Sequence, residues 1–211
     1  MKILITAGPT REKLDPVRFI TNRSSGKMGY ALARAAQMAG MEVTLVSGPV
    51  DLPAPEGVRL IRIESAAEMA GAVFAEAPCQ DMIIMAAAVA DYRPAEVAEQ
   101  KIKKQDGAFY LRLERTTDIL AGLGKNKQPG QILVGFAAES ENLLTNAQGK
   151  LERKNLDWIA ANSVSDGFGT DTDTIILLGK NGERIQIGPD SKQNVAVRLI
   201  ELTQKKESGS R

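Results

Sequence analysis

Residues 2–46 read KILITAGPTREKLDPVRFITNRSSGKMGYALARAAQMAGMEVTLV, and this stretch decides the fold. It opens with an apolar run, Lys2–Ala7, which is typical of a buried strand that ends at Gly8. Apolar residues then recur at helical spacing over Met28–Ala39, and Gly40 follows as a helix stop. A second apolar run, Glu42–Val46, comes directly after it. This order of strand, helix and strand predicts a βαβ unit whose strands lie parallel in one sheet.

The same alternation continues along the chain. Further strands are expected at Val58–Ile63, Met82–Ala88, Ile132–Phe136 and Trp158–Ala161. Helices are expected from a Ser65 cap to Ala77, from about Glu141 to Lys154, and from an Asp190 or Ser191 cap to Leu202. The turn Asn181-Gly182 predicts a hairpin of Thr174–Leu178 and Glu183–Ile187. We therefore expect an α/β fold, a Rossmann-like, mostly parallel sheet with helices on both faces and a β-hairpin or arm elaboration. It forms one domain over residues 1–202, followed by a flexible tail at residues 203–211.

Composition excludes several classes of function. The 211 residues include 27 basic and 26 acidic side chains, and the net charge of +1 argues against nucleic acid or a membrane surface as partner. Histidine is absent, which removes Ser-His-Asp and Cys-His catalysis and histidine-ligated metals. The one cysteine, Cys79, is expected to be a small buried filler and suits a reducing cytoplasm. With no membrane span and no room for a signal peptide before the first strand, we expect a cytoplasmic protein.

Two connections are longer than simple βα loops, and long loops after strand ends are where α/β sheets bind ligands. In the first, Gly8–Lys27, the residues Ser24, Ser25 and Gly26 stand directly before a helix N-terminus, which attracts phosphate. Gly8, Ser24, Ser25 and Gly26 are therefore candidate phosphate-loop residues. The alternative is an N-cap with glycines placed for packing, which leaves the polar residues of the loop unexplained.

The second long connection, from Ala90 to about Gln131, carries Asp91 and the run Lys101-Ile102-Lys103-Lys104. Asp91 can accept from a ribose hydroxyl, and lysines that alternate on an extended arm suit a triphosphate. A solvated loop is the alternative for this lysine run. Lys150 and Lys154 share one face of a helix, and taken alone this pair is more typical of solvent decoration than of ligand contact.

A dinucleotide site fits poorly. The first loop is longer than G-x-G-x-x-G permits, and the second strand ends Leu45-Val46-Ser47-Gly48 without an acidic residue for a ribose. Gly26-Lys27 also lacks the spacing of a Walker A loop. A Rossmann-type NAD(P)-dependent reductase is the alternative enzyme, and a nucleotide-binding sensor is the non-enzymatic alternative. Pyrophosphate release from CTP separates both from a ligase.

The motifs ITAGPTREKLDPVRFITNRSSGKMG, AAAVADYRP with KIKK, GFAAE and RKNLD together resemble the bacterial, CTP-dependent phosphopantothenoylcysteine synthetases. This family is often found as the C-terminal half of a bifunctional coenzyme A biosynthesis protein. The resemblance covers Lys2 to Leu202. It implies a ligase that joins 4′-phosphopantothenate to cysteine through an acyl-cytidylate, releasing pyrophosphate and CMP. The flavin-dependent decarboxylase half is not part of this chain, so no flavin is expected.

The resemblance also implies the site. Asn22 matches the family's asparagine at the acyl-cytidylate, where its amide can donate to the acyl oxygen, and Lys101 matches the catalytic lysine of the KIKK arm. Contacts to CTP are implied for Met85, Ala86, Ala87, Asp91, Lys101, Thr117, Asp118, Ile119, Leu120, Phe136, Lys150 and Lys154. The family usually has proline where this chain has Thr117, whose hydroxyl can cap the short helix expected near Asp118–Leu123.

Mg²⁺ with CTP is implied as cofactor, without an indication of its protein ligands, and a homodimer is implied with sites near the subunit interface. Two segments are candidates for reaching the partner subunit, the Thr174–Ile187 hairpin and the Ala90–Lys104 arm.

Overall fold

A mostly parallel eight-stranded sheet forms the centre of the computed structural model, which describes residues 1–104, 106–139, 141–163 and 171–204. The strand order is β12-β11-β10-β9-β6-β1-β4-β5. From β5 to β10 every neighbouring pair is parallel, while β11 and β12 add antiparallel pairs at one edge. Its strands are β1 Lys2–Ala7, β4 Glu42–Ser47, β5 Arg59–Arg62, β6 Met82–Met85, β9 Ile132–Glu139, β10 Trp158–Ser163, β11 Thr172–Gly179 and β12 Arg184–Ser191. The predicted fold class is confirmed.

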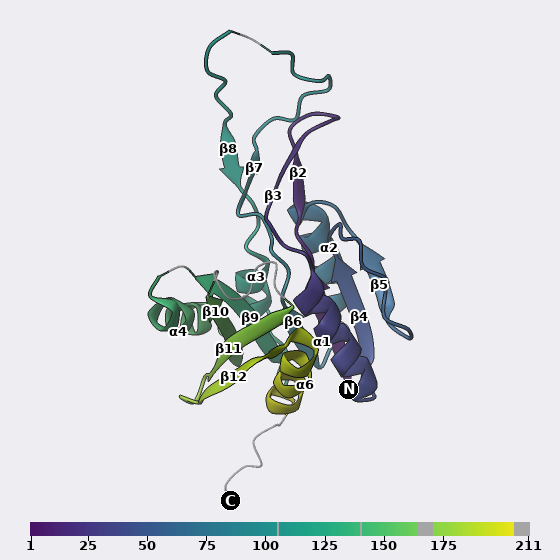
Figure 1. Cartoon of the computed structure of the whole chain (residues 1–211), viewed down its shortest axis with the longest axis vertical. Coiled ribbons are helices and arrows are strands. Elements are labelled where there is room, and N and C mark those ends of the chain that lie inside the picture. The colour runs from purple at the N-terminus through teal and green to yellow at the C-terminus, as the bar shows by residue number, and fades with distance from the viewer. Residues whose placement is uncertain (105, 140, 164–170, 205–211) are drawn as a thin grey trace, which may run out of the picture.

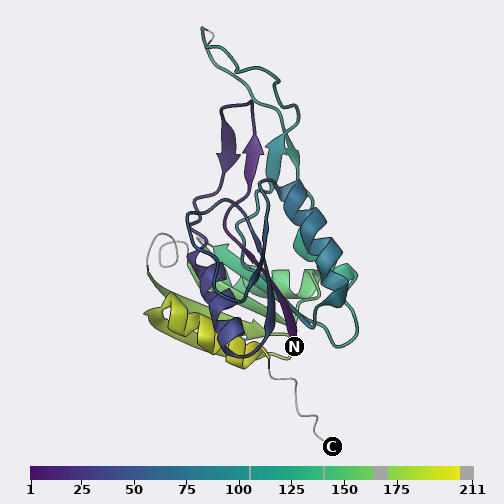
Figure 2. The same ribbon diagram turned by 90° about the vertical axis from the view of Figure 1, so that its right-hand side faces the viewer.

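Helices cover both faces of this sheet (Figures 1 and 2). They are α1 Lys27–Met38, α2 Ala66–Glu76, α3 Ile119–Lys125, α4 Leu143–Arg153 and α6 Lys192–Thr203, with a short 3-10 turn, η1, at Ala77–Cys79. One core joins α1 and α6 to the face that carries Ile3 and Ile5. The other joins α2, α3 and α4 to the face that carries Leu4 and Ile83. Alternate residues of the central strands thus bury both faces, as a parallel sheet requires.

Caps and turns lie where the sequence predicts them. Ser65 Oγ accepts from Glu68 N–H at the start of α2, and Ser191 Oγ accepts from Asn194 N–H at the start of α6. Gly40 has a φ of 77° directly after α1 and its cap residue. The Asn181-Gly182 turn joins β11 to β12. Helix α6 continues to the fully buried Thr203, one residue into the expected tail, and residues 205–211 lie outside the described part of the chain.

Three expectations about local structure are wrong. Strand β6 ends at Met85 and not at Ala88, because the Ala87 N–H donates to the Thr6 hydroxyl (3.1 Å) and leaves the backbone ladder. Cys79 is exposed in the turn η1 and is no buried filler. Asp118, and not Thr117, caps α3, since its carboxylate accepts from the Ala121 N–H at 3.0 Å.

The two long connections carry short strands that the sequence analysis did not predict. The first contains the hairpin of β2 (Arg11–Lys13) and β3 (Phe19–Thr21), and the second contains β7 (Tyr92–Pro94) and β8 (Leu113–Arg115). Both hairpins rise from one end of the molecule, and the loop between β7 and β8 reaches farthest from the sheet (Figures 1 and 2). We call residues 92–115 the arm.

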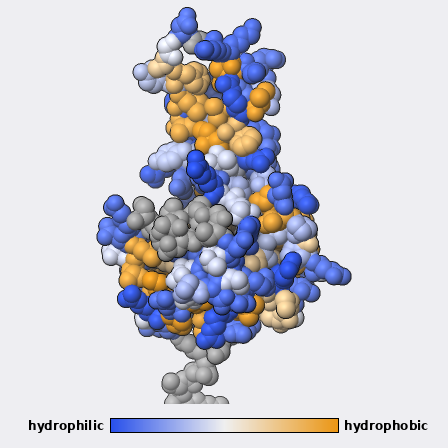
Figure 3. Space-filling view, viewed as in Figure 1, coloured by the Kyte–Doolittle hydropathy of each residue, from blue (hydrophilic) through white to orange (hydrophobic). Residues whose placement is uncertain are grey.

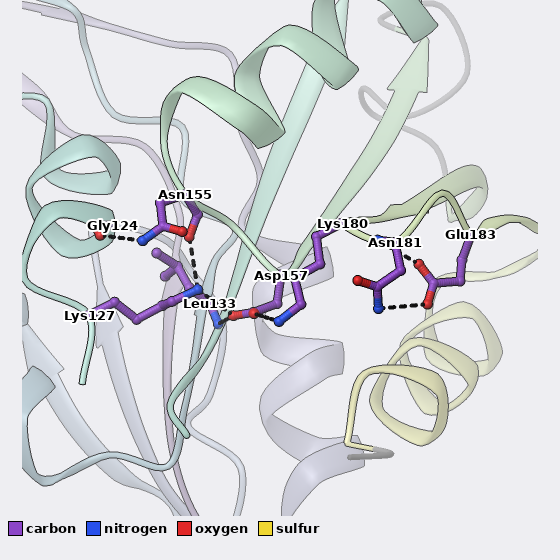
Figure 4. A network of polar contacts seen from close by, with 8 residues as sticks. All are labelled: Gly124, Lys127, Leu133, Asn155, Asp157, Lys180, Asn181 and Glu183. Atoms are coloured by element: carbon purple, nitrogen blue, oxygen red, sulfur yellow. Dashed lines mark hydrogen bonds and ion pairs between the residues drawn. The ribbon is translucent and has the colours of Figure 1, made fainter. Parts of the chain in front are cut away.

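Asp157 lies at the amino-terminal ends of the parallel strands, away from the hairpins. It directly precedes β10 and contacts β9 and the residue after β11 (Figure 4). Its carboxylate accepts from the Leu133 N–H of β9 (2.8 Å), from Lys127 (3.1 Å) and from Lys180 after β11 (2.9 Å). Burial raises the pKa of Asp157, but the Leu133 amide and the two lysines outweigh it and hold the pKa below its ordinary value. In the described residues, no helix is long and apolar enough to cross a membrane.

Candidate functional site

Two adjoining cavities lie where the sheet order reverses direction. Strands β4 and β5 extend the sheet on one side of β1, whereas β6 and β9 extend it on the other. In open α/β sheets, ligands bind outside the carboxyl ends of the strands at such a switch point. The connections after β1 and β6 meet there, since Pro9 pairs with Ala88 and the Ala88 N–H donates to Gly8 O at 2.9 Å.

The first cavity, of about 430 Å³, opens at the N-terminus of α1, and we call it the α1 cavity. Its lining comprises Asn22, Arg23, Ser24, Ser25, Gly26, Lys27, Met28, Gly29, Ala86, Ala87, Ala88, Val89, Asp91, Phe136, Ala138, Lys150, Asn162, Asp173 and Lys192. Three of the four candidate phosphate-loop residues are thus in the lining. The fourth, Gly8, lies behind Gly26, where a Cβ on Gly26 would stand 3.3 Å from the Gly8 Cα.

Glycine is required where α1 meets the sheet. Gly26 is the cap residue of α1 with a φ of 74°, a conformation that side chains with a Cβ rarely adopt. A Cβ on Gly29 would lie 2.5 Å from the Ala7 Cβ, so only glycine lets the first turn of α1 contact β1 this closely. The free N–H groups of that turn are therefore held at the mouth of the cavity, in the arrangement that favours phosphate.

Asn22 faces the end of β6 with its amide nitrogen. Asn22 Nδ2 donates to Ala88 O and Val89 O, both at 3.2 Å. The expected hydrogen bond from this amide to an acyl oxygen stays a prediction. Asn22 lines the α1 cavity, and its side-chain oxygen can only accept a hydrogen bond.

The second cavity, of about 380 Å³, lies between α3, α4 and the end of β6, and we call it the α3–α4 cavity. Its lining comprises Met85, Ala87, Val89, Asp91, Tyr92, Arg115, Thr116, Thr117, Asp118, Ile119, Leu120, Phe136, Lys150 and Lys154. Ten of the twelve residues expected to contact a nucleotide lie in this lining, and Ala86 lines the α1 cavity. Ala87, Val89, Asp91, Phe136 and Lys150 line both cavities. These five residues therefore form a wall that the two cavities share.

The two lysines of α4 reach this edge of the sheet. Lys150 Nζ donates to Phe136 O at 2.8 Å, and Lys154 Nζ pairs with the Asp118 carboxylate at 2.8 Å. Burial raises the pKa of Asp118, yet the Lys154 ammonium and the Ala121 amide together keep it below its ordinary value. Lys154 is thus held in the lining by a carboxylate that also caps α3.

Lys101 lies in neither cavity lining. It is exposed on the arm, between β7 and β8, in the part of the chain that projects beyond the sheet (Figure 1). The same chain therefore does not bring Asn22 and Lys101 into one cavity. Asp91, in contrast, lies at the root of the arm and lines both cavities.

Several polar residues of the α1 cavity were not predicted from the sequence. Asn162 at the end of β10 donates to the buried Asp173 of β11 at 3.3 Å, and Lys192 begins α6. Burial lowers the pKa of Lys192, and Lys27 lowers it further, while Asp173 and Asp171 oppose this shift. Lys27 itself pairs with Asp171 at 2.6 Å. The carboxyl end of β10 lies at the same sheet edge as that of β9, which is the signal that could have pointed to Asn162.

Basic residues outnumber acidic ones around the two cavities, with Arg23, Lys27, Arg115, Lys150, Lys154 and Lys192 against Asp91, Asp118 and Asp173. Such a balance suits a polyanionic ligand. Among the described residues, no group of three acidic or cysteine side chains could hold a metal ion by itself.

Known proteins with this sequence pattern share the fold. Residues 1–206 match the model of the DNA/pantothenate metabolism flavoprotein C-terminal domain. The coenzyme A biosynthesis bifunctional protein CoaBC of Bacillus subtilis is 48% identical over 203 residues, which cover 94% of this chain and 50% of that protein. The Escherichia coli CoaBC is 48% identical over 191 residues, covering 88% and 47%. The chain therefore spans about half the length of the curated relatives it matches.

Solved structures agree with this assignment. The crystal structure of the C-terminal domain of a CoaBC protein superposes with a TM-score of 0.82 at 45% identity, covering 95% of this chain and 92% of that one. The DNA/pantothenate metabolism flavoprotein from Streptococcus pneumoniae gives a TM-score of 0.83 at 26% identity, covering 97% and 98%. Sequence, fold and coverage agree, and the chain belongs to the family of DNA/pantothenate metabolism flavoprotein C-terminal domains.

Proposed function

We propose that this chain is a phosphopantothenate–cysteine ligase of coenzyme A biosynthesis that uses CTP. One observation carries the proposal. Ten residues implied as nucleotide contacts, from segments as distant as Met85, Thr117–Leu120 and Lys154, converge on one cavity of the fold. The relatives named above, which act in coenzyme A biosynthesis by their names, support the same reaction class.

In the proposed reaction, the carboxylate of 4′-phosphopantothenate attacks the α-phosphorus of CTP, and the bond to the β-phosphate breaks to release pyrophosphate. The amine of cysteine then attacks the acyl carbon, CMP leaves with the bonding electrons, and the amine loses a proton. Such phosphoryl and acyl transfers depend chiefly on positioning and charge neutralisation, so a site without histidine can perform them.

The chain's own residues divide this work between the two cavities. Backbone groups around Met85 and Thr117–Leu120 would bind the cytosine edge, while Lys150 and Lys154 neutralise phosphate charge. The first turn of α1 would bind a phosphate in the α1 cavity. The Asn22 oxygen would accept from a donor such as the attacking amine.

Mg²⁺ fits this donor set as a cation held mainly by nucleotide phosphates. Magnesium is usually bound through one or two carboxylates together with substrate phosphates. Asp91, whose position in the lining joins both cavities, is the carboxylate that would hold it. When bound, the cation supplies neutralisation of the triphosphate charge.

We further propose that the protein acts as a homodimer in which the arm contacts the partner subunit. Large apolar side chains are exposed on the arm, with Tyr110 at 90%, Phe109 at 58%, Val97 at 56% and Leu113 at 44%. Figure 3 shows a hydrophobic, orange area on the upper part of the molecule, where the hairpins project. Such a patch on a projecting element is typical of an interaction site. A dimer would also bring Lys101 of one chain to the cavities of the other.

Pyrophosphate release tests the ligase proposal. The chain is incubated with CTP, Mg²⁺ and 4′-phosphopantothenate, with and without cysteine, and then with ATP in place of CTP. We expect one equivalent of pyrophosphate per site without cysteine and continuous turnover with it. Because polar readout of a base edge discriminates strongly, kcat/KM is expected to be at least about a hundredfold higher for CTP than for ATP. CTP binding without pyrophosphate would indicate a sensor, and equal kcat/KM values would refute the nucleotide choice.

Light scattering after size exclusion tests the dimer. The wild type is expected at twice the chain mass, and the variant Tyr110→Asp, which places a charge in the exposed patch, is expected to shift toward the monomer. A monomeric wild type would refute this part of the proposal.

A further inference from the structure

Asp15, in the turn between β2 and β3, has a buried carboxylate that lines neither cavity. Its two oxygens have different partners. Oδ1 accepts from the backbone N–H groups of Val17 (2.8 Å) and Arg18 (2.9 Å), which closes the turn itself. Oδ2 accepts from the Arg18 guanidinium, with Nε at 3.0 Å, and from the Ile102 N–H at 3.1 Å. Only Oδ2 therefore reaches outside the turn.

Ile102 stands between Lys101 and Lys103, and both of its backbone polar groups are held by this turn. Its N–H donates to Asp15, and its carbonyl accepts from Arg18 Nη2 at 2.9 Å. A third bond between the two segments joins the Ala98 N–H to Leu14 O at 2.9 Å. The lysine-bearing part of the arm is thus attached to a turn that lies more than eighty residues earlier in the chain.

The attachment is electrostatic as well as geometric. The Arg18 guanidinium holds the pKa of Asp15 well below its ordinary range, so the carboxylate remains charged at any pH near neutrality. Hydrogen bonds to a charged group contribute more than neutral ones, and here one guanidinium joins the carboxylate to the Ile102 carbonyl. Lys101 and Lys103 are exposed on either side of this fixed residue.

We propose that Asp15 is a positioning residue, which fixes the backbone of Ile102 and thereby sets where Lys101 stands for the reaction. The proposal rests on the ligase function proposed above and on the catalytic role that the family resemblance implies for Lys101. A lysine on a long untethered loop would lose much conformational freedom each time it bound a ligand, and a fixed backbone removes part of that cost beforehand.

Asp15→Asn separates the two oxygens. The amide keeps an acceptor at Oδ1 for the turn, but it places an NH₂ group against the donors of Arg18 and Ile102. The control is Glu114→Gln, which removes the exposed Arg93–Glu114 ion pair (2.8 Å) of the same arm and leaves Ile102 untouched.

Limited trypsin digestion of the folded chain tests the attachment independently of activity. Cleavage after Lys101, Lys103 and Lys104 is followed by mass spectrometry and is expected to be about tenfold faster in Asp15→Asn than in the wild type. This factor corresponds to the loss of one hydrogen bond to a charged group from the state in which the arm is attached to the turn. Other sites and the Glu114→Gln control should match the wild type. Equal cleavage rates in Asp15→Asn and wild type would overturn the proposal.

Epistasis tests the link to Lys101. Asp15→Asn is expected to lower kcat for pyrophosphate formation about tenfold with the KM for cysteine unchanged, and to cause no further loss in a Lys101→Ala background. Additive losses, or faster cleavage with an unchanged kcat, would overturn the positioning role. If the wild type releases no pyrophosphate, the ligase proposal fails while the digestion still decides the attachment.

If Asp15→Asn does not fold by circular dichroism, Arg18→Gln takes its place. This variant removes the donor to the Ile102 carbonyl but keeps the Oδ1 bonds of the turn. The same faster cleavage and the same lack of additivity are expected, and their absence overturns the proposal equally.

Discussion

Asp157→Asn tests how much one carboxylate contributes to the stability of the sheet where the antiparallel strand β11 joins the parallel strands (Figure 4). The Asp157 side chain is 11% exposed, and Lys127, one of its two lysine partners, is 15% exposed. An asparagine can keep its oxygen toward the Leu133 N–H and Lys127, but its NH₂ group then faces Lys180, which is 55% exposed and can turn to water. The variant therefore loses the ion pair with Lys180. It keeps the hydrogen bonds from the Leu133 N–H and Lys127, but their acceptor is then a neutral oxygen.

The size of the effect follows from these contacts. Hydrogen bonds to charged groups contribute about 1.5–3 kcal/mol each, and part of this remains when a neutral oxygen replaces a carboxylate, so we expect a loss of about 2–3 kcal/mol in the free energy of unfolding. For a chain of this size, each kcal/mol corresponds to about 2–4 °C in Tm, which predicts a decrease of about 4–12 °C at pH 7.

The pH dependence gives a second check. Because the pKa of Asp157 is lowered in the folded state, its stabilisation is present above the unfolded pKa of about 3.9 and is lost as the pH falls through the folded value. The difference in Tm between wild type and Asp157→Asn is therefore expected to be constant from about pH 7 to pH 5 and to shrink below about pH 4.

Thermal unfolding followed by circular dichroism at pH 7, 5 and 3 measures both effects. Lys180→Gln is the matched control, because an exposed ion-pair partner contributes at most about 1 kcal/mol. Activity at 25 °C should be unchanged in both variants, since Asp157 lies at the sheet edge opposite the cavities. A decrease in Tm below about 2 °C for Asp157→Asn, or the same decrease at all three pH values, would refute this reasoning.

Three further variants test the site. Gly29→Ala places a Cβ 2.5 Å from that of Ala7 and should lower the free energy of unfolding by about 1–3 kcal/mol in urea, whereas Gly71→Ala, whose Cβ meets nothing within 4 Å, should raise it by about 0.5–1 kcal/mol. Lys154→Met should weaken CTP binding about tenfold by calorimetry, the cost of about one charged contact, and an unchanged Kd would remove Lys154 from the site. Asn22→Asp should still release a burst of pyrophosphate but turn over slowly, and quenched flow without a burst would assign Asn22 to activation instead.

The central elements were predictable because their signals are local and repeated. Strand β1 lies at Lys2–Ala7, as its apolar run predicts. Gly40, with its positive φ, directly follows α1 and its cap residue, where the sequence predicts the helix stop. Ser65 and Ser191 cap the helices that follow them. In each case the residues that decide the structure lie within four or five positions of one another, so a short stretch of sequence includes all of them.

The short hairpins were not predictable for the opposite reason. Strands β2, β3, β7 and β8 have three residues each, too few for an alternating pattern to be distinguished from a loop. They are held by contacts between distant positions, such as Asp15 with Ile102. Arg11, whose guanidinium lies 4.6 Å from the centre of the Phe19 ring, joins β2 to β3 in the same way.

The site shows the same division. Loop length and strand topology were enough to place the search at the carboxyl edge, where both cavities lie. Asp173 was missed because β11 is antiparallel, so its beginning, and not its end, meets this edge. Lys192 directly follows the carboxyl end of β12, which pairs antiparallel with β11 and so runs parallel to β10. Residue spacing along one element carries no information about the direction of a strand that pairs with it.

Lys150 and Lys154 show why a helix face alone does not indicate a function. Their spacing places both side chains on one side of α4, and the same spacing would occur on a face that meets only water. The fold adds what the spacing cannot give, the neighbours: β9 presents the Phe136 carbonyl to Lys150, and the start of α3 presents Asp118 to Lys154. Each lysine is thereby held by a partner within the chain while it lines the α3–α4 cavity. Preorganised cations of this kind bind a polyanion at a lower cost in side-chain entropy than freely moving ones do.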